Sequence, residues 1–102
     1  MPVFIVVSKH TPENCPIRNE STRKIFVEFP DKLAELLQKY AIKLIGNWAI
    51  MPEHKIILVL DAPTADVFQK LMVEPYIIQF LSYNETKIKW ATPTQEGMKL
   101  LK

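Results

Sequence analysis

Two short runs that are apolar at every position constrain the fold more than any other feature of the chain. Residues Val3 to Val7 are five consecutive apolar residues, too short a run and too β-branched for a helix. The segment Lys55 to Leu60 carries a second run of this kind. Because side chains alternate between the faces of a strand, a sheet built from these runs is apolar on both sides. Such a sheet needs a cover on each face.

The first half of the chain alternates helical and strand patterns around these runs. Apolar side chains recur every three or four residues from Glu20 to Tyr40, which predicts a helix that Pro30 kinks or splits. Lys43 to Met51 alternates as a strand, with Leu44, Trp48 and Ile50 expected on one face. Residues 51–54 then make a turn into the strand Lys55 to Leu60, which predicts a hairpin.

The second half continues with a helix, a strand and a short terminal helix. Pro63 and Thr64 open the second helix, and Glu74-Pro75 interrupts it. Residues 75–81 fit a helical turn or a strand, and the helical turn is favoured. Thr86 to Trp90 alternates apolar residues with lysines and indicates an edge strand. A cap at Thr92 and a proline at position 93 predict a terminal helix over residues 93–101.

The element order is β-α-β-β-α-β, which predicts an α+β, ferredoxin-like domain spanning residues 1–102. Both helices should cover one face of a four-stranded antiparallel sheet. The other face would expose an apolar patch larger than monomers usually tolerate, so we expect a homodimer with the open sheet faces packed together. In the alternative arrangement, the terminal helix from residue 93 folds over the free face.

Composition excludes several classes of function. Thirteen basic and eleven acidic residues are scattered along the chain and give a net charge of +2, so nucleic acid is not an expected partner. The apolar runs of about five residues are far shorter than the roughly 20 that span a bilayer, and the start lacks a signal-peptide pattern. A cytoplasmic protein without a membrane partner is expected. The single cysteine, Cys15, is then a free thiol.

Three segments carry a resemblance to a known group of folds. The sequence His10-Thr-Pro-Glu-Asn-Cys-Pro, then Gly46-Asn-Trp48 and Pro52-Glu-His54, resembles small uncharacterised prokaryotic proteins of the dimeric α+β barrel superfamily. That superfamily includes muconolactone isomerases, antibiotic-biosynthesis-type monooxygenases, haem-degrading monooxygenases and stress-responsive barrel proteins. The resemblance implies a pocket between the helices and the sheet for a small organic or haem substrate. No catalytic residue transfers, because none of their motifs matches this chain.

The segment from His10 to Pro16 concentrates the candidate chemistry. His10 could act as an acid or base and Cys15 as a nucleophile, with Glu13, Asn14, Trp48 and Tyr83 around a small-molecule pocket. Each residue also has an ordinary explanation. His10 could simply end a strand, Cys15 could be a small buried side chain, and the two aromatics could belong to the core or its rim. The protein is therefore a small-molecule enzyme or binder, or a non-catalytic dimeric module such as a metal or effector sensor.

A transition metal is the expected cofactor if one is bound. Zinc, copper or iron would accept His10, Cys15 and His54 as ligands. The first and third strands are expected to run parallel in this fold, so His10 and His54 should lie at opposite ends of the sheet, about 20 Å apart. On this argument, the partner subunit of a dimer must supply His54.

Overall fold

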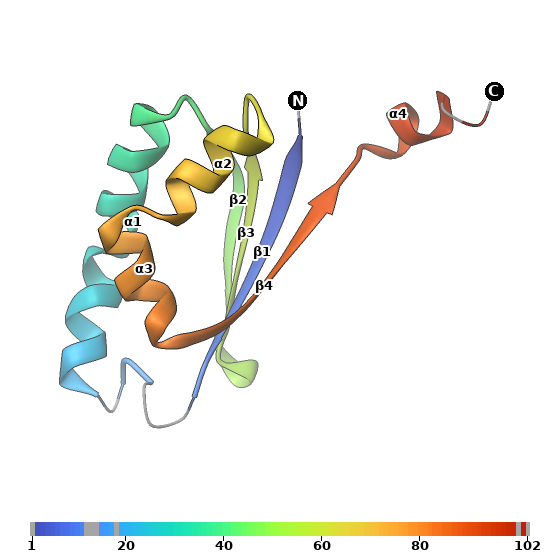
Figure 1. Ribbon diagram of the computed structural model, residues 1–102. Helices are drawn as coiled ribbons and strands as arrows, with labels where there is room; N and C mark the ends of the chain where they lie inside the picture. Colours follow the sequence, from blue (N-terminus) through green and yellow to red (C-terminus); the bar gives the residue numbers. More distant parts are fainter. Residues whose placement is uncertain (1, 12–14, 18, 100, 102) are drawn as a thin grey trace.

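The chain folds into a four-stranded antiparallel sheet with helices on one face, as seen in a computed structural model (Figure 1). The structure describes residues 2–11, 15–17, 19–99 and 101. The strands are β1 (Val3–His10), β2 (Lys43–Ile50), β3 (Lys55–Asp61) and β4 (Asn84–Ala91), in the order β2-β3-β1-β4. The helices are α1 (Glu20–Lys39), α2 (Ala65–Met72), α3 (Pro75–Ser82) and α4 (Thr94–Lys99), and the 3₁₀ turn η2 is Met51–Glu53. The predicted ferredoxin-like order, with a short C-terminal helix, is confirmed.

Local signals explain where the helices begin and how far they run. The Asn19 side-chain oxygen accepts hydrogen bonds from the backbone N–H groups of Ser21 and Thr22, at 3.0 and 3.2 Å, and so caps α1. Pro30 lies within α1 on its exposed side, and the helix continues through it to Lys39 without splitting. Residues 75–82 form α3, which confirms the helical alternative for this segment.

The hydrophobic core lies between the helices and one face of the sheet. Phe4 of β1 stacks on Phe68 of α2 with ring centroids 3.9 Å apart, and Phe29 of α1 stacks on Phe80 of α3 at 4.1 Å. Phe4 and Val6 are buried, whereas the intervening Ile5 is only half-buried. The alternation predicted from the sequence therefore sorts β1 into a core face and a free face.

A β-bulge in β2 changes the faces that the sequence pattern predicted for this strand. Leu44 pairs with Leu60 of β3 on the core face, and the register shifts between Leu44 and Gly46. Trp48 then pairs with Ile57, which belongs to the free face. The expectation that Leu44 and Trp48 share a face is wrong, because the extra residue of a bulge inverts the alternation beyond it.

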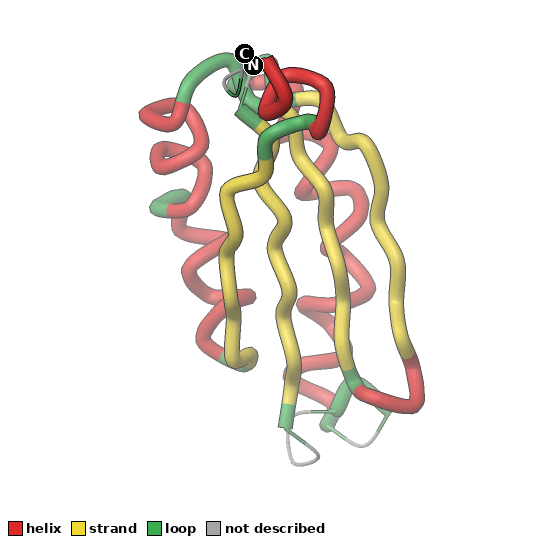
Figure 2. The backbone as a smooth tube through the Cα atoms, turned by 90° about the vertical axis from the view of Figure 1, so that its right-hand side faces the viewer, coloured by secondary structure: helices red, strands yellow, loops and turns green. Residues whose placement is uncertain are grey.

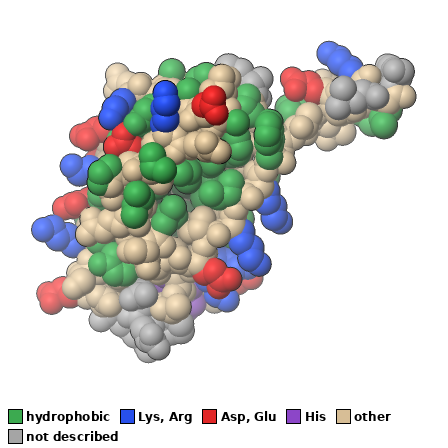
Figure 3. All heavy atoms as spheres, viewed as in Figure 1, with side chains coloured by type: hydrophobic (Ala, Val, Ile, Leu, Met, Phe, Trp, Pro, Cys, Tyr) green, Lys and Arg blue, Asp and Glu red, His purple; other side chains and the backbone are tan. Residues whose placement is uncertain are grey.

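The second face of the sheet remains uncovered in a single chain. Its centre consists of half-buried aliphatic side chains and the exposed indole of Trp48, namely Ile5, Val7, Trp48, Ile57 and Val59, which we call the free face. Figure 2 shows the strands open to the viewer, with the α1 to α3 layer behind them. The terminal helix α4 lies beyond one end of the sheet and stands clear of the body (Figures 1 and 3). It does not cover the free face.

Of the helices in the described ranges, none is both long enough and apolar enough to cross a membrane.

A glycine is predicted to be necessary at position 46, because the indole of Trp48 lies directly against its backbone. A Cβ atom at position 46 would lie 2.0 Å from the end of that ring, so Gly46→Ala must displace the indole. We expect a loss of about 1–3 kcal/mol in the free energy of unfolding, measured by urea denaturation. In a Trp48→Ala background the loss should nearly vanish. Gly97→Ala, where no atom lies within 4 Å, is the control and should not destabilise the protein. An equal cost of Gly46→Ala in both backgrounds would refute the steric explanation.

Candidate functional site

The candidate site lies where the end of β1 meets the start of β3. These strands pair in antiparallel register from Val3 with Asp61 to Lys9 with Lys55. The backbone N–H of His10 donates to the carbonyl of His54 at 3.1 Å. The expectation that His10 and His54 lie at opposite ends of the sheet is therefore wrong. A helical crossover makes β1 parallel to β2, and the hairpin that follows makes β3 antiparallel to both.

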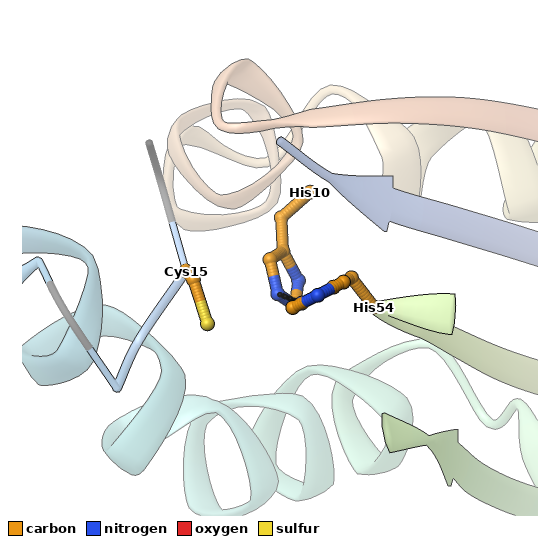
Figure 4. A group of neighbouring side chains, drawn as sticks. All are labelled: His10, Cys15 and His54. Carbon is orange, nitrogen blue, oxygen red and sulfur yellow. Dashed lines mark hydrogen bonds between the residues drawn. The ribbon is translucent and has the colours of Figure 1, made fainter. Parts of the chain in front are cut away.

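The two imidazoles contact each other directly. Nε2 of His10 lies 3.2 Å from Nδ1 of His54, and the rings are nearly perpendicular (Figure 4). His10 is 8% exposed, and its Nδ1 atom is buried without a hydrogen-bond partner in the described part of the chain. Buried polar atoms are normally paired, so this nitrogen has a lone pair or an N–H that the described residues leave open to another partner.

The turn before β3 fixes the position of His54. The residue ends η2 in the left-handed backbone conformation, with φ 56° and ψ 39°, and its N–H donates to the carbonyl of Met51. Few residues other than glycine adopt this conformation, although histidine does so more readily than most. The backbone of His54 therefore shapes the turn while its side chain faces His10.

The loop after β1 brings Cys15 to the same place. Its side chain is 5% exposed, and its sulfur points toward the imidazoles (Figure 4). The backbone N–H of Asn19 donates to the Cys15 carbonyl at 2.8 Å. Arg23 donates from Nε to the carbonyl of Pro16 and from Nη2 to that of Ile17, at 2.8 and 2.7 Å. The start of α1 thus holds the loop segment that carries the thiol.

The structure brings all three predicted metal ligands together within one subunit. One ligand atom from each of His10, Cys15 and His54 lies within 4.8 Å of the others. The expectation that only the partner subunit could bring His54 near His10 and Cys15 is wrong, because His54 of the same chain lies beside them. Glu13 and Asn14, two of the predicted pocket residues, lie outside the described residues.

A mainly apolar cleft adjoins the three side chains. It has a volume of about 210 Å³. Its lining consists of the two histidines, Cys15 and residues from the loop, α1, β2, η2 and β3: Pro16, Ile17, Phe26, Ala49, Ile50, Met51, Lys55 and Ile56. The predicted pocket residues Trp48 and Tyr83 do not line it. The bulge turns Trp48 to the free face, and Tyr83 packs against the core at the end of α3.

Sequence reasoning missed most of the apolar lining, Phe26 above all. The ring of Phe26 meets that of His10 edge-on at 5.5 Å. Phe26 belongs to the apolar repeat that predicts the helix from Glu20 to Tyr40, but this repeat carries no information on proximity to His10. With the first and third strands expected to run parallel, the sequence does not connect the helix with both histidines.

The environment favours a neutral imidazole at His10. Burial lowers the pKa of His10, and the neighbouring His54 lowers it further. A neutral imidazole has a lone pair available to accept a proton, bind a metal or contact a polar ligand group. The site therefore offers a base in the lining of an apolar cleft.

Comparison with known proteins supports the fold and no specific activity. No protein-family model and no curated protein sequence matches the chain. Among solved structures, an uncharacterised NIPSNAP domain protein from Burkholderia xenovorans aligns with TM-score 0.63 and 13% identity, over 91% of this chain and 94% of its own. An antibiotic biosynthesis monooxygenase aligns with TM-score 0.64 and 7% identity, over 91% and 98%. A protein from Agrobacterium tumefaciens aligns with TM-score 0.60 and 19% identity, over 91% and 93%.

These similarities agree with the fold predicted from the sequence. The chain has a ferredoxin-like fold, and each alignment extends over about nine-tenths of it. At such low identity, the shared fold carries no function with it. Function has to be argued from the cleft and its side chains.

The free energy of unfolding of the metal-free protein is predicted to fall as the pH drops below the ordinary His10 pKa of 6.5. The unfolded chain takes up a proton near that pH, whereas folded His10 resists protonation until a lower pH. The unfolded state then binds more protons and is favoured by acid, while above pH 6.5 the stability is fully retained. Urea titrations between about pH 7 and pH 5 should show a shallower decline for His10→Gln. An unchanged slope would contradict this assignment.

Proposed function

We propose that the protein binds a small, mainly apolar molecule in the cleft beside His10 and His54. The observation that carries this proposal is an apolar cleft whose lining includes two imidazoles in contact with each other, one buried and one half-buried. Ligand sites typically combine apolar walls with a few converging polar groups, and this cleft has that composition. Its volume of about 210 Å³ is below the roughly 300–1,000 Å³ of drug-sized sites, which favours a fragment-sized ligand.

The proposed roles of the side chains follow from their positions. Phe26 and Ile56 supply apolar contacts, and the imidazoles supply the polar contact in the same lining. Neutral His10 is suited to act as a general base toward a bound molecule, since its lowered pKa keeps the lone pair free near pH 7. The free thiol of Cys15 in the same lining agrees with a reducing, cytoplasmic setting.

Ligand binding is predicted to require the empty volume of the cleft. Indole and benzimidazole, titrated into ¹⁵N-labelled protein, should shift the amide signals of His10, Ile17 and His54 first. Dissociation constants of about 1 mM are expected for ligands of this size. Ala49→Phe, which places a ring in the cleft, should abolish these shifts.

The matched control introduces the same ring elsewhere. The control is Ala34→Phe. Ala34 is exposed on α1, in a depression that is lined by residues of α1 and β2 and does not include the histidines. This variant should leave the titration unchanged. Shifts that survive Ala49→Phe, or shifts scattered over the surface, would contradict the proposed pocket.

We also propose that two copies pack through the free face to form a homodimer. Ile5, Val7, Ile57 and Val59 form a continuous apolar centre on neighbouring strands, and no described helix covers it. Monomers rarely leave a patch of this kind open, and two identical copies can bury it against each other.

A charge at the centre of the free face is predicted to dissociate the dimer. Ile57 pairs with both Val7 and Trp48, so Ile57→Lys would bury a cation in an apolar interface. Sedimentation should give twice the chain mass of 11.8 kDa for the wild type and the chain mass for the variant. Val27→Lys replaces an equally apolar residue that is 71% exposed on α1, and it should remain dimeric. A wild-type protein that sediments as a monomer at micromolar concentration would refute the proposal.

A further inference from the structure

We infer that His10, Cys15 and His54 of a single subunit form a three-ligand site for a zinc-type divalent ion, with a fourth position open to the cleft. This inference deepens the proposed function, because it supplies the polar end of the same ligand site. It needs no residue from a second chain. Its support is the arrangement of the ligand atoms, their chemistry, and the way the fold holds each of them.

The spacing of the histidine nitrogens suits tetrahedral coordination. Two Zn–N bonds of about 2.0–2.1 Å at a tetrahedral angle hold their nitrogens about 3.3 Å apart. Nε2 of His10 and Nδ1 of His54 are 3.2 Å apart. A Zn–S bond of about 2.3 Å holds the sulfur about 3.6 Å from each nitrogen. One ligand atom from each of the three residues lies within 4.8 Å of the other two, so a small inward closure of the group completes the geometry.

The ligand types select the class of ion. Two imidazoles and a thiolate suit zinc and its neighbours, whereas magnesium and calcium require oxygen ligands. The thiol loses its proton to solvent when it binds the metal. The short contact between the imidazoles must also open, so that both nitrogens direct a lone pair at the ion.

Each ligand comes from a different part of the fold, and each is restrained independently. His10 is held by strand pairing and His54 by its turn, and their backbones are joined by the hydrogen bond between them. Cys15 is held through the hydrogen bonds that Asn19 and Arg23 make to the carbonyls of residues 15–17. Arg23 touches no candidate ligand atom, so it is a positioning residue. Restraints of this kind reduce the ordering cost of metal binding.

The fourth position has no protein ligand among the described residues. The group of three includes no further histidine, cysteine or carboxylate from that part of the chain. Glu53, next to His54, is 56% exposed along its side chain and pairs with Lys55 at 3.5 Å. Sites with three protein ligands leave one position for water or substrate. The cleft would then favour a molecule with an apolar body and one metal-binding head group, such as a carboxylate, thiol or azole.

The experiment uses zinc for stoichiometry and cobalt as its coloured substitute. Reduced, chelator-treated protein should bind one Zn²⁺ per chain by calorimetry. Co²⁺ should produce visible ligand-field bands of a tetrahedral site and a thiolate-to-cobalt band in the near ultraviolet. Cys15→Ser should lose the thiolate band, and His10→Gln and His54→Asn should each weaken Zn²⁺ binding at least 100-fold. Asparagine tolerates the left-handed backbone at position 54.

Two neighbouring substitutions serve as controls for the ligand variants. Lys9→Gln changes the residue before His10. The side chain of Lys9 is exposed and lies on the other face of β1. Glu53→Gln removes the carboxylate next to His54. Both should bind Zn²⁺ as the wild type does. A 100-fold loss in Glu53→Gln would make that carboxylate a ligand and overturn the three-ligand site.

Substitution of Arg23 tests whether this residue positions the loop that carries Cys15. Arg23→Ala should weaken Zn²⁺ binding about tenfold, yet the thiolate-to-cobalt band should return in full at saturation. Lys24→Ala, at an exposed position on the same helix, should have no effect. A thiolate band that stays absent in Arg23→Ala at saturation would refute the positioning role.

The outcomes separate this inference from the proposals on which it rests. No zinc bound by the reduced wild type would overturn the metal site, while indole could still enter the cleft and leave the proposed function standing. Zinc bound by the wild type and lost in monomeric Ile57→Lys would overturn the single-subunit site in favour of one shared between subunits. Zinc bound at one ion per chain in both proteins is the expected result.

Discussion

Antiparallel pairing of β1 with β3 is the interaction on which the rest of the structure depends. It places β1 at the centre of the sheet, where its core face meets the helices and its other face joins the free face. The same pairing brings the last residue of β1 beside the first turn of the hairpin, so His10 and His54 meet although 44 residues separate them. The hydrophobic core and the candidate site therefore depend on a single ladder of backbone hydrogen bonds.

The two faces of the sheet serve different purposes. On the core face, aromatic stacking of Phe4 on Phe68 and of Phe29 on Phe80 joins the sheet to the helices. On the free face, the indole of Trp48 covers the backbone at Gly46, and the aliphatic centre remains open to a second copy. The cleft lies at one end of the sheet, beside the histidines, and none of the five free-face residues lines it.

Much of this fold was predictable, because hydrophobic periodicity fixes which segments are strands and which face the core. The candidate residues were predictable as well, since His10, Cys15 and His54 are the imidazole and thiol side chains of the sequence. Their proximity was not predicted, because the first and third strands were expected to run parallel. In the structure β3 runs antiparallel to β1, which brings His54 beside His10. The bulge near Gly46 was also missed, because a single extra residue leaves no clear trace in an alternating pattern.

The left-handed backbone conformation of His54 separates what the turn requires from what the imidazole contributes. A non-glycine residue in that region costs about 1 kcal/mol, and glycine would occupy the same turn with little steric penalty. His54→Gly would thus relieve the turn while it removed the imidazole that faces His10. The turn geometry alone would accept glycine at position 54, so the histidine there keeps an imidazole beside His10 that the turn itself does not require.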